Sequence, residues 1–162
     1  MGAFRTSKRA GLIAAAFLLA VSASLLLADD DKEKEKIKVT VVAVLASSEH
    51  NRIDKRLLDL VPELKKKDAS WTGFEVERSC AESMKIGEQH EFTLVDDFKV
   101  TITLKGRTEK GGVRVGLQSQ SIEDFGYTCC CGKYFALDTQ FNTKEKKRLV
   151  VAIMVEPCSK KK

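Results

Sequence analysis

The stretch Leu149-Val150-Val151-Ala152-Ile153-Met154-Val155 is the longest apolar run of the sequence outside the N-terminus. A run of this length without polar alternation predicts a strand that is covered on both faces, and therefore a central strand of its sheet. Pro157 follows closely and has no backbone N–H for further pairing. We therefore expect the sheet to be organised around residues 148–155.

The segment Phe125–Leu137 is predicted to be the hairpin partner of this strand, through a connection at residues 138–147. It contains three consecutive cysteines at positions 129–131. Such a hairpin would return Cys158 to a position beside the first of these cysteines.

One helix is predicted, at residues Ile53–Lys67. Its apolar residues recur at i, i+4, i+7, i+8 and i+11, which forms a single stripe at the 3.6-residue period. These residues are Ile53, Leu57, Leu60, Val61 and Leu64. Asn51 or Asp54 would cap the helix, and Pro62 should kink it or split it near Leu58 because proline lacks a backbone donor.

Short segments that alternate with period two make up most of the remaining chain. Strands are expected at Ile37–Leu45, 74–86, 90–94, 98–104 and 113–117, with a turn at Asp96-Asp97 and a loop at Gly106–Gly112. Such a succession is typical of an antiparallel meander. The expected fold class is therefore α+β, mainly an antiparallel β sandwich or curled sheet of about seven strands with one amphipathic helix.

Residues 1–28 have the features of a targeting segment. Three basic residues precede position 10, and residues 11–28 are almost wholly apolar and end in small residues. We expect a signal peptide cleaved after Ala23 or Ala28, and Ala23 fits the small-residue rule better. The alternative is an uncleaved anchor at residues 11–28, which would then be the one contact with the membrane. Either way, the rest of the chain would be exported to the periplasm, the cell envelope or the medium.

The charge of the chain is nearly balanced without this leader. The sequence has 28 basic and 23 acidic residues, and a leader with three basic and no acidic residues leaves a net charge of +2. Both signs alternate in a charged spacer at residues 29–36, and the basic clusters at 65–67, 144–148 and 160–162 are interpreted as solvated charge. No concentrated basic surface for nucleic acid is predicted. Residues 37–158 should form a single β-rich domain, followed by a basic tail at 159–162.

Five cysteines lie in the part that would be exported. They are Cys80, Cys129, Cys130, Cys131 and Cys158. An oxidising compartment favours disulfides, and we expect Cys129 to bond to Cys158 and Cys80 to bond to Cys131 or Cys130, which leaves one thiol over. The alternative is that several of them are small buried hydrophobic residues.

A second hypothesis is a thiol-redox or metal-binding module centred on Cys129–Cys131. The consecutive cysteines differ from the Cys-x-x-Cys pattern at a helix N-terminus, although Lys133 would favour a thiolate. Their spacing is too tight for a structural zinc site, to which only His50 and His90 could add imidazole ligands. The sequence therefore predicts no metal and no cofactor.

Sequence motifs of the common catalytic sites are missing. The chain lacks Gly-x-Ser-x-Gly, the phosphate-binding Gly-x-x-x-x-Gly-Lys, His-Glu-x-x-His and Gly-x-Gly-x-x-Gly. With only two histidines, it also has few candidates for the commonest general base. We therefore assign no catalytic residue, and the sequence favours a protein that is not an enzyme.

The stretches YTCCCGKYF (residues 127–135) and RLVVAIMVEPC (residues 148–158) resemble segments of small exported bacterial proteins of uncharacterised function. The resemblance extends over roughly Ile37–Cys158. It implies an exported bacterial domain and brings no activity or site residue. Together with the missing catalytic motifs, it favours a non-catalytic binding or structural module whose loops or sheet edges recognise another protein or an envelope polymer.

Export should be accompanied by removal of the leader. We expect protein recovered from the envelope or the medium to begin at Ser24, or at Asp29 if the second site is used. N-terminal sequencing and intact mass of the protein from each cell fraction measure this. Recovery from the cytosol of a chain that still begins at Met1 would contradict the expectation of export.

Overall fold

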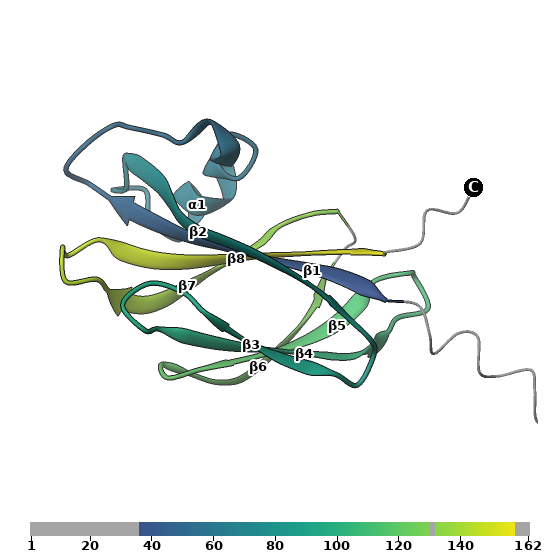
Figure 1. The fold of residues 1–162 in the computed structure, drawn as a ribbon. Coiled ribbons are helices and arrows are strands. Elements are labelled where there is room, and N and C mark those ends of the chain that lie inside the picture. The colour runs from purple at the N-terminus through teal and green to yellow at the C-terminus, as the bar shows by residue number, and fades with distance from the viewer. Residues whose placement is uncertain (1–35, 130–131, 158–162) are drawn as a thin grey trace, which may run out of the picture.

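The computed structural model describes residues 36–129 and 132–157, and this part of the chain consists mostly of β-strands (Figure 1). Its elements are β1 (Ile37–Ser47), the 3-10 helix η1 (Lys55–Leu57), α1 (Val61–Lys67), β2 (Gly73–Met84), β3 (Gln89–Thr93), β4 (Lys99–Arg107), β5 (Val113–Ser119), β6 (Ile122–Cys129), β7 (Phe135–Asn142) and β8 (Arg148–Pro157). The strands form two antiparallel sheets of four, a first sheet in the order β2-β1-β8-β7 and a second in the order β3-β4-β5-β6. The described residues therefore contain eight strands where about seven were expected.

Strand β8 lies between β1 and β7 in the first sheet, which confirms the prediction that it is a central strand. Its pairing with β1 is continuous from Ile37–Pro157 to Ala46–Arg148. Because alternate side chains of a strand point to opposite faces, the odd-numbered apolar residues of β1 and β8 share one face. They join apolar residues of β4 and β5 in one hydrophobic core that connects the two sheets. Each fully buried aliphatic side chain contributes about 1.5–3 kcal/mol to this packing.

The even-numbered residues of β1 and β8 point to the opposite face of the first sheet. There Val44, Val150 and Ala152 are completely buried, and they belong to a second hydrophobic cluster. This cluster also contains Leu57, Leu60, Leu64, Trp71 and Phe74 from the segment between β1 and β2 and from the start of β2. Figure 1 shows the helical segment on the side of the first sheet that faces away from the second sheet.

The prediction of one strand at Phe125–Leu137 is wrong. This segment contains the end of one sheet and the beginning of the other, because β6 pairs with β5 whereas β7 pairs with β8. Gly132 lies between them with a φ of +76°, a backbone conformation that glycine adopts without steric cost. The rings of Tyr127 and Phe135 stack with centroids 4.1 Å apart, so the two edge strands remain in contact after the chain has changed sheets.

The helix predicted at Ile53–Lys67 is divided into η1 and α1. Pro62 occupies the first turn of α1, where the missing N–H has no intrahelical partner in any case, so a helix starts at the proline instead of passing through it. Asp54 caps η1 by accepting a hydrogen bond from the Arg56 N–H. The apolar stripe still packs on the second cluster, although Ile53 does so from an isolated bridge to Phe74 rather than from a helix.

Strand β2 contains a β-bulge that alternation alone does not reveal. Residues 74, 76, 78 and 80 were expected on one face, but the register with β1 shifts between Ala43 and Val44. Val76 therefore packs on the outer cluster with Phe74, whereas Cys80 packs on the core between the sheets. An extra residue in one strand reverses the direction of the side chains that follow it.

The β3–β4 turn agrees with the sequence, whereas the β4–β5 loop differs from it in length. Asp96 and Asp97 form the β3–β4 turn with φ values of +47° and +61°, which aspartate tolerates better than most residues. The β4–β5 loop is shorter than expected, because β4 continues to Arg107.

Among the described residues, no helix has the length and apolar character required to span a membrane.

A pair of leucines in the helical segment tests the outer cluster. Leu64 has no exposed surface, whereas Leu58 is 60% exposed. We expect Leu64→Ala to lower the free energy of unfolding by about 2–5 kcal/mol, and the matched Leu58→Ala to change it by less than about 0.5 kcal/mol. Urea unfolding measures both, and equal effects would contradict the packing of this segment on the sheet.

Candidate functional site

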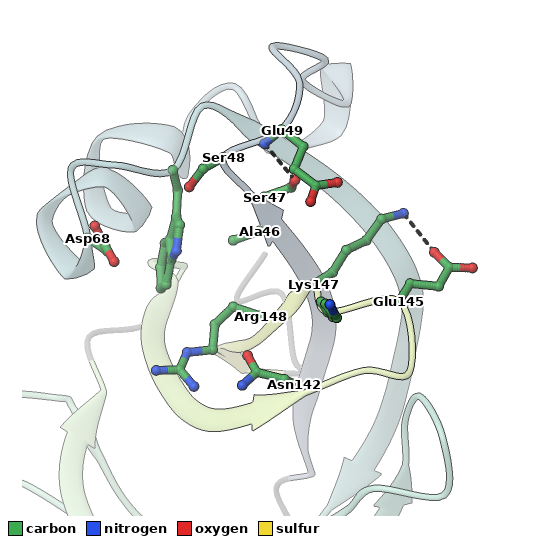
Figure 2. A pocket seen from close by; sticks show the side chains of 11 residues that line it. Ala46, Ser47, Ser48, Glu49, Asp68, Asn142, Glu145, Lys147 and Arg148 are labelled. Carbon is green, nitrogen blue, oxygen red and sulfur yellow. Dashed lines mark hydrogen bonds and ion pairs between the residues drawn. The ribbon is translucent and has the colours of Figure 1, made fainter.

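A polar hollow of about 330 Å³ lies on the outer face of the first sheet, at the end of β1 (Figure 2). Three separate segments line it: the end of β1 with the residues after it, the segment after α1, and the β7–β8 turn. The lining residues are Ala46, Ser47, Ser48, Glu49, Asp68, Trp71, Asn142, Glu145, Lys146, Lys147 and Arg148. The hollow therefore brings together residues that are up to about a hundred positions apart in the sequence.

Its floor is a row of three residues on neighbouring strands. Arg148, the first residue of β8, pairs with Ala46 of β1 on one side and with Asn142 of β7 on the other. Ala46 belongs to the outer cluster, so directly paired Arg148 and Asn142 lie on the same face. The Nε of Arg148 lies 3.1 Å from a carboxylate oxygen of Asp138, which holds the guanidinium in place along the sheet.

A bulge in β7 places Asn142 in this row. The register of β7 with β8 shifts between Asp138 and Asn142, and Gln140 has a φ of +60°. The hydroxyl of buried Thr139 donates a 2.7 Å hydrogen bond to the carbonyl oxygen of Leu149 and accepts one from the Phe141 N–H at 3.2 Å. These bonds satisfy backbone groups that the bulge removes from the ladder.

A short turn after α1 forms one wall. Asp68 ends the helix, and its side chain accepts a 2.8 Å hydrogen bond from the Ser70 N–H, an aspartate turn that brings Trp71 down onto the sheet. Hydrogen bonding from the side chain of Ser70 and then from its N–H, with a smaller contribution from the charge of Arg148, lowers the pKa of Asp68. Trp71 lines the hollow with the remaining 7% of its surface and is otherwise buried in the outer cluster.

The residues after β1 form the opposite rim. The Ser47 hydroxyl accepts a 3.0 Å hydrogen bond from the Glu49 N–H (Figure 2). The next residue, His50, lies so close to Gly73 that a Cβ there would be 2.1 Å from its Nδ1. Only glycine allows this approach, so Gly73 sets the position of the rim relative to β2.

A charge network attaches the β7–β8 turn to β2. The Nζ of Lys147 donates a 3.0 Å hydrogen bond to Glu75 and lies 3.2 Å from Glu145, and Arg52 lies 3.3 Å from the other oxygen of Glu75. The Lys147 hydrogen bond, followed by the charges of Lys147 and Arg52, lowers the pKa of Glu75. The hydrogen bonds with Glu75 and then Glu145 raise the pKa of Lys147.

This network corrects the interpretation of the cluster at 144–148 as solvated charge for its last two residues, whereas residues 144–146 are exposed as expected. The side chains of Lys147 and Arg148 are only 24% and 29% exposed, and both are paired with carboxylates. The sequence could not predict these ion pairs of Lys147 and Arg148, because their partners Glu75 and Asp138 lie on other strands. The one feature of the sequence that could have drawn attention to the hollow is Trp71, the single tryptophan of the chain.

The formal charges of the lining residues cancel. Three lining residues are acidic and three are basic, and the least exposed cations already have anionic partners. The other lining groups are the exposed Glu49, Asp68 and Lys146, the Asn142 amide, the Ser48 hydroxyl and one aromatic side chain. Such a site recognises a ligand by hydrogen bonds and shape rather than by net charge.

The cysteines are not part of this hollow. Cys129 is 2% exposed in the core between the sheets, and its Sγ donates a 3.7 Å hydrogen bond to the carbonyl oxygen of Lys133. Half-buried Cys80 packs against the same core. No disulfide is present among the described residues. Each predicted bond involves Cys130, Cys131 or Cys158, which lie outside the described residues, so those bonds stay predictions.

The aromatic residue beside Cys129 is also buried. The hydroxyl of Tyr127 has no hydrogen-bond partner within residues 36–129 and 132–157. Burial, with a smaller contribution from Cys129, raises the pKa of Tyr127. The phenol therefore stays neutral at physiological pH and acts as a packing residue.

The two histidines lie at different places in the fold. The Nδ1 of His50 accepts a 3.3 Å hydrogen bond from the Arg52 N–H, which leaves the proton on Nε2, 3.8 Å from Glu75. His90 is exposed on β3 and packs edge-on against Phe92. In the part of the chain that the structure describes, no group of three or more His, Cys, Asp or Glu residues could hold a metal ion.

No protein-family model, curated protein or solved structure matches this chain. The resemblance of residues 127–135 and 148–158 to small exported bacterial proteins therefore stays a prediction. In the structure only the end of the first segment, at the start of β7, pairs with β8, which contains the second segment. The beginning of the first segment lies in β6 and belongs to the second sheet.

The Glu75 network is expected to stabilise the fold in a pH-dependent way. Glu75→Gln should lower the free energy of unfolding by about 1 kcal/mol at pH 7. Because the folded-state pKa of Glu75 is lowered, its stabilisation is present above the unfolded-state pKa and is lost as the pH falls through the folded-state value. Urea unfolding of wild type and variant should therefore converge in acid.

The control for this experiment is Glu77→Gln. Glu77 is exposed on the same strand and belongs to no ion pair among the described residues. We expect it to leave stability unchanged at every pH. A difference between Glu75→Gln and wild type that widens toward low pH would contradict the assigned direction of the shift.

Proposed function

We propose that this protein is an exported, non-catalytic binding module that recognises a component of the cell envelope through the polar hollow. The scaffold would be a β sandwich formed by the two sheets. Support for the sandwich comes from the single hydrophobic core to which both sheets contribute. Support for export comes from the leader at residues 1–28.

The binding proposal rests on one observation: ion pairs and hydrogen bonds within the protein already hold several side chains that line the hollow. Arg148 is held by Asp138, Lys147 by Glu75 and Glu145, and Asp68 by Ser70. These bonds join the hollow to β2, β7 and β8, so the side chains of Arg148, Lys147 and Asp68 are already in place when a ligand arrives. Sites built on rigid elements and held by supporting hydrogen bonds bind with a smaller entropic cost.

The position of Cys129 makes us prefer this function to the thiol-redox or metal-binding alternative centred on Cys129–Cys131. Reactive cysteines are partly exposed and lie in electropositive surroundings. Cys129 is almost completely buried among apolar residues, where a thiol is a small hydrophobic side chain.

A sedimentation assay tests the proposed function. Purified full-length protein is mixed with envelopes of the cells that produce it, and the bound fraction is measured after centrifugation. We expect saturable binding that weakens about tenfold in the double variant Ser48→Ala/Asn142→Ala, since each lost hydrogen bond to a ligand contributes about 0.5–1.5 kcal/mol. Both residues are exposed, and their side chains make no hydrogen bond with another described residue that the substitutions would remove.

The matched control is Ser79→Ala/Gln118→Ala, which removes the same kinds of group from exposed positions on β2 and β5. This control should bind as wild type does. Equal binding by the hollow variant and the control would show that the hollow does not recognise the envelope.

A further inference from the structure

We infer that the ligand of the hollow is a neutral saccharide unit of a surface polymer, an inference that rests on the proposed binding function. The first argument is electrostatic. The lining charges cancel, and the two least exposed cations are already paired with carboxylates. An anionic ligand would meet as many carboxylates as cations, since Glu49, Asp68 and Glu145 accompany Lys146, Lys147 and Arg148 in the lining. Sites for phosphate and carboxylate groups normally present an excess of Arg or Lys donors.

The second argument is the mixture of donors and acceptors. The ion pair of Arg148 with Asp138 uses Nε, so the terminal nitrogens of the guanidinium are available as donors. The amide of Asn142 and the hydroxyl of Ser48 both donate and accept, and Asp68 accepts. Figure 2 shows Arg148 and Asn142 side by side below the hollow, with Ser48 above them and Asp68 at the left. Sugar hydroxyl groups, which also donate and accept, match such a ring of mixed partners.

The third argument is the shape and lining of the hollow. Its volume is about 330 Å³ and it is open to solvent, which places it near the lower limit of roughly 300–1,000 Å³ for small-molecule sites. One or two sugar units fit such a space, and an open side lets a polymer continue beyond it. Trp71 is the single aromatic residue of the lining, and its exposed 7% offers a small apolar surface to the C–H groups of a sugar ring.

The same tryptophan provides the measurement. Trp71 is the only tryptophan of the protein, so all intrinsic tryptophan fluorescence of the full-length chain comes from a side chain that lines the hollow. The probes are chitotetraose, maltotetraose, cellotetraose and the neutral saccharide fraction released from envelopes of the producing cells. Inorganic phosphate and polygalacturonate are the anionic comparisons.

We expect a saturable change of emission with at least one neutral probe and none with phosphate or polygalacturonate. The affinity should be the same at 50 mM and 500 mM salt, because no net charge is neutralised. Asn142→Ala should weaken binding about tenfold, and Gln118→Ala, an exposed amide on β5, should not.

Three results would overturn the inference. They are salt-dependent binding of an anionic probe, binding of a neutral probe that Asn142→Ala does not weaken, and no response to any neutral probe. If the hollow variant still reduces sedimentation with envelopes in the last situation, the binding function stands and the ligand is not a neutral saccharide. If sedimentation is also unaffected, both proposals fail.

Discussion

The fold depends on the burial of two adjacent strands, β1 and β8, on both of their faces. Their backbone pairing is continuous over ten positions, and alternate side chains enter two different hydrophobic clusters. The second sheet covers one face. The helical segment must cover the other, because Val44, Val150 and Ala152 would otherwise expose apolar surface to water. The architecture of the described residues follows from this double requirement.

The same requirement explains where the hollow lies. The helical cover ends at Asp68, and the row Ala46, Arg148 and Asn142 is the last row of the outer face. Apolar side chains give way to polar ones at this row, where buried Ala46 lies beside Arg148 and the exposed Asn142. A polar concave surface therefore forms beside a hydrophobic cluster, an arrangement common among small-molecule sites.

Ion pairs then hold the hollow in place. Lys147 and Glu75 are 72 positions apart, and their contact connects the β7–β8 turn to the edge strand β2. Pairs of this exposure contribute little to stability individually. Their consequence is geometric, because they hold the turn and the rim of the hollow against the sheet. They also pair Lys147 and Arg148 with carboxylates, which is one basis of the proposal that a ligand is bound through hydrogen bonds.

The sequence by itself determined the character of the local segments. The apolar run at residues 149–155 indicates a central strand, Asp96-Asp97 a turn, and the stripe from Ile53 to Leu64 a segment that packs on apolar surface. Pro62 indicates that this segment is not one helix. These properties depend on period, backbone chemistry and hydrophobicity, which are read within about a dozen neighbouring residues.

Only the tertiary structure decided which strands pair and which side chains meet. The segment at 125–137 alternates in the same way whether it continues in one sheet or crosses to the other, and the change of sheet at Gly132 has no strong local signal. Bulges in β2 and β7 change the direction of side chains through pairing with another strand. The hollow also combines three distant segments. Contacts between residues so far apart in the chain follow from the packing of the sheets, which no local pattern encodes.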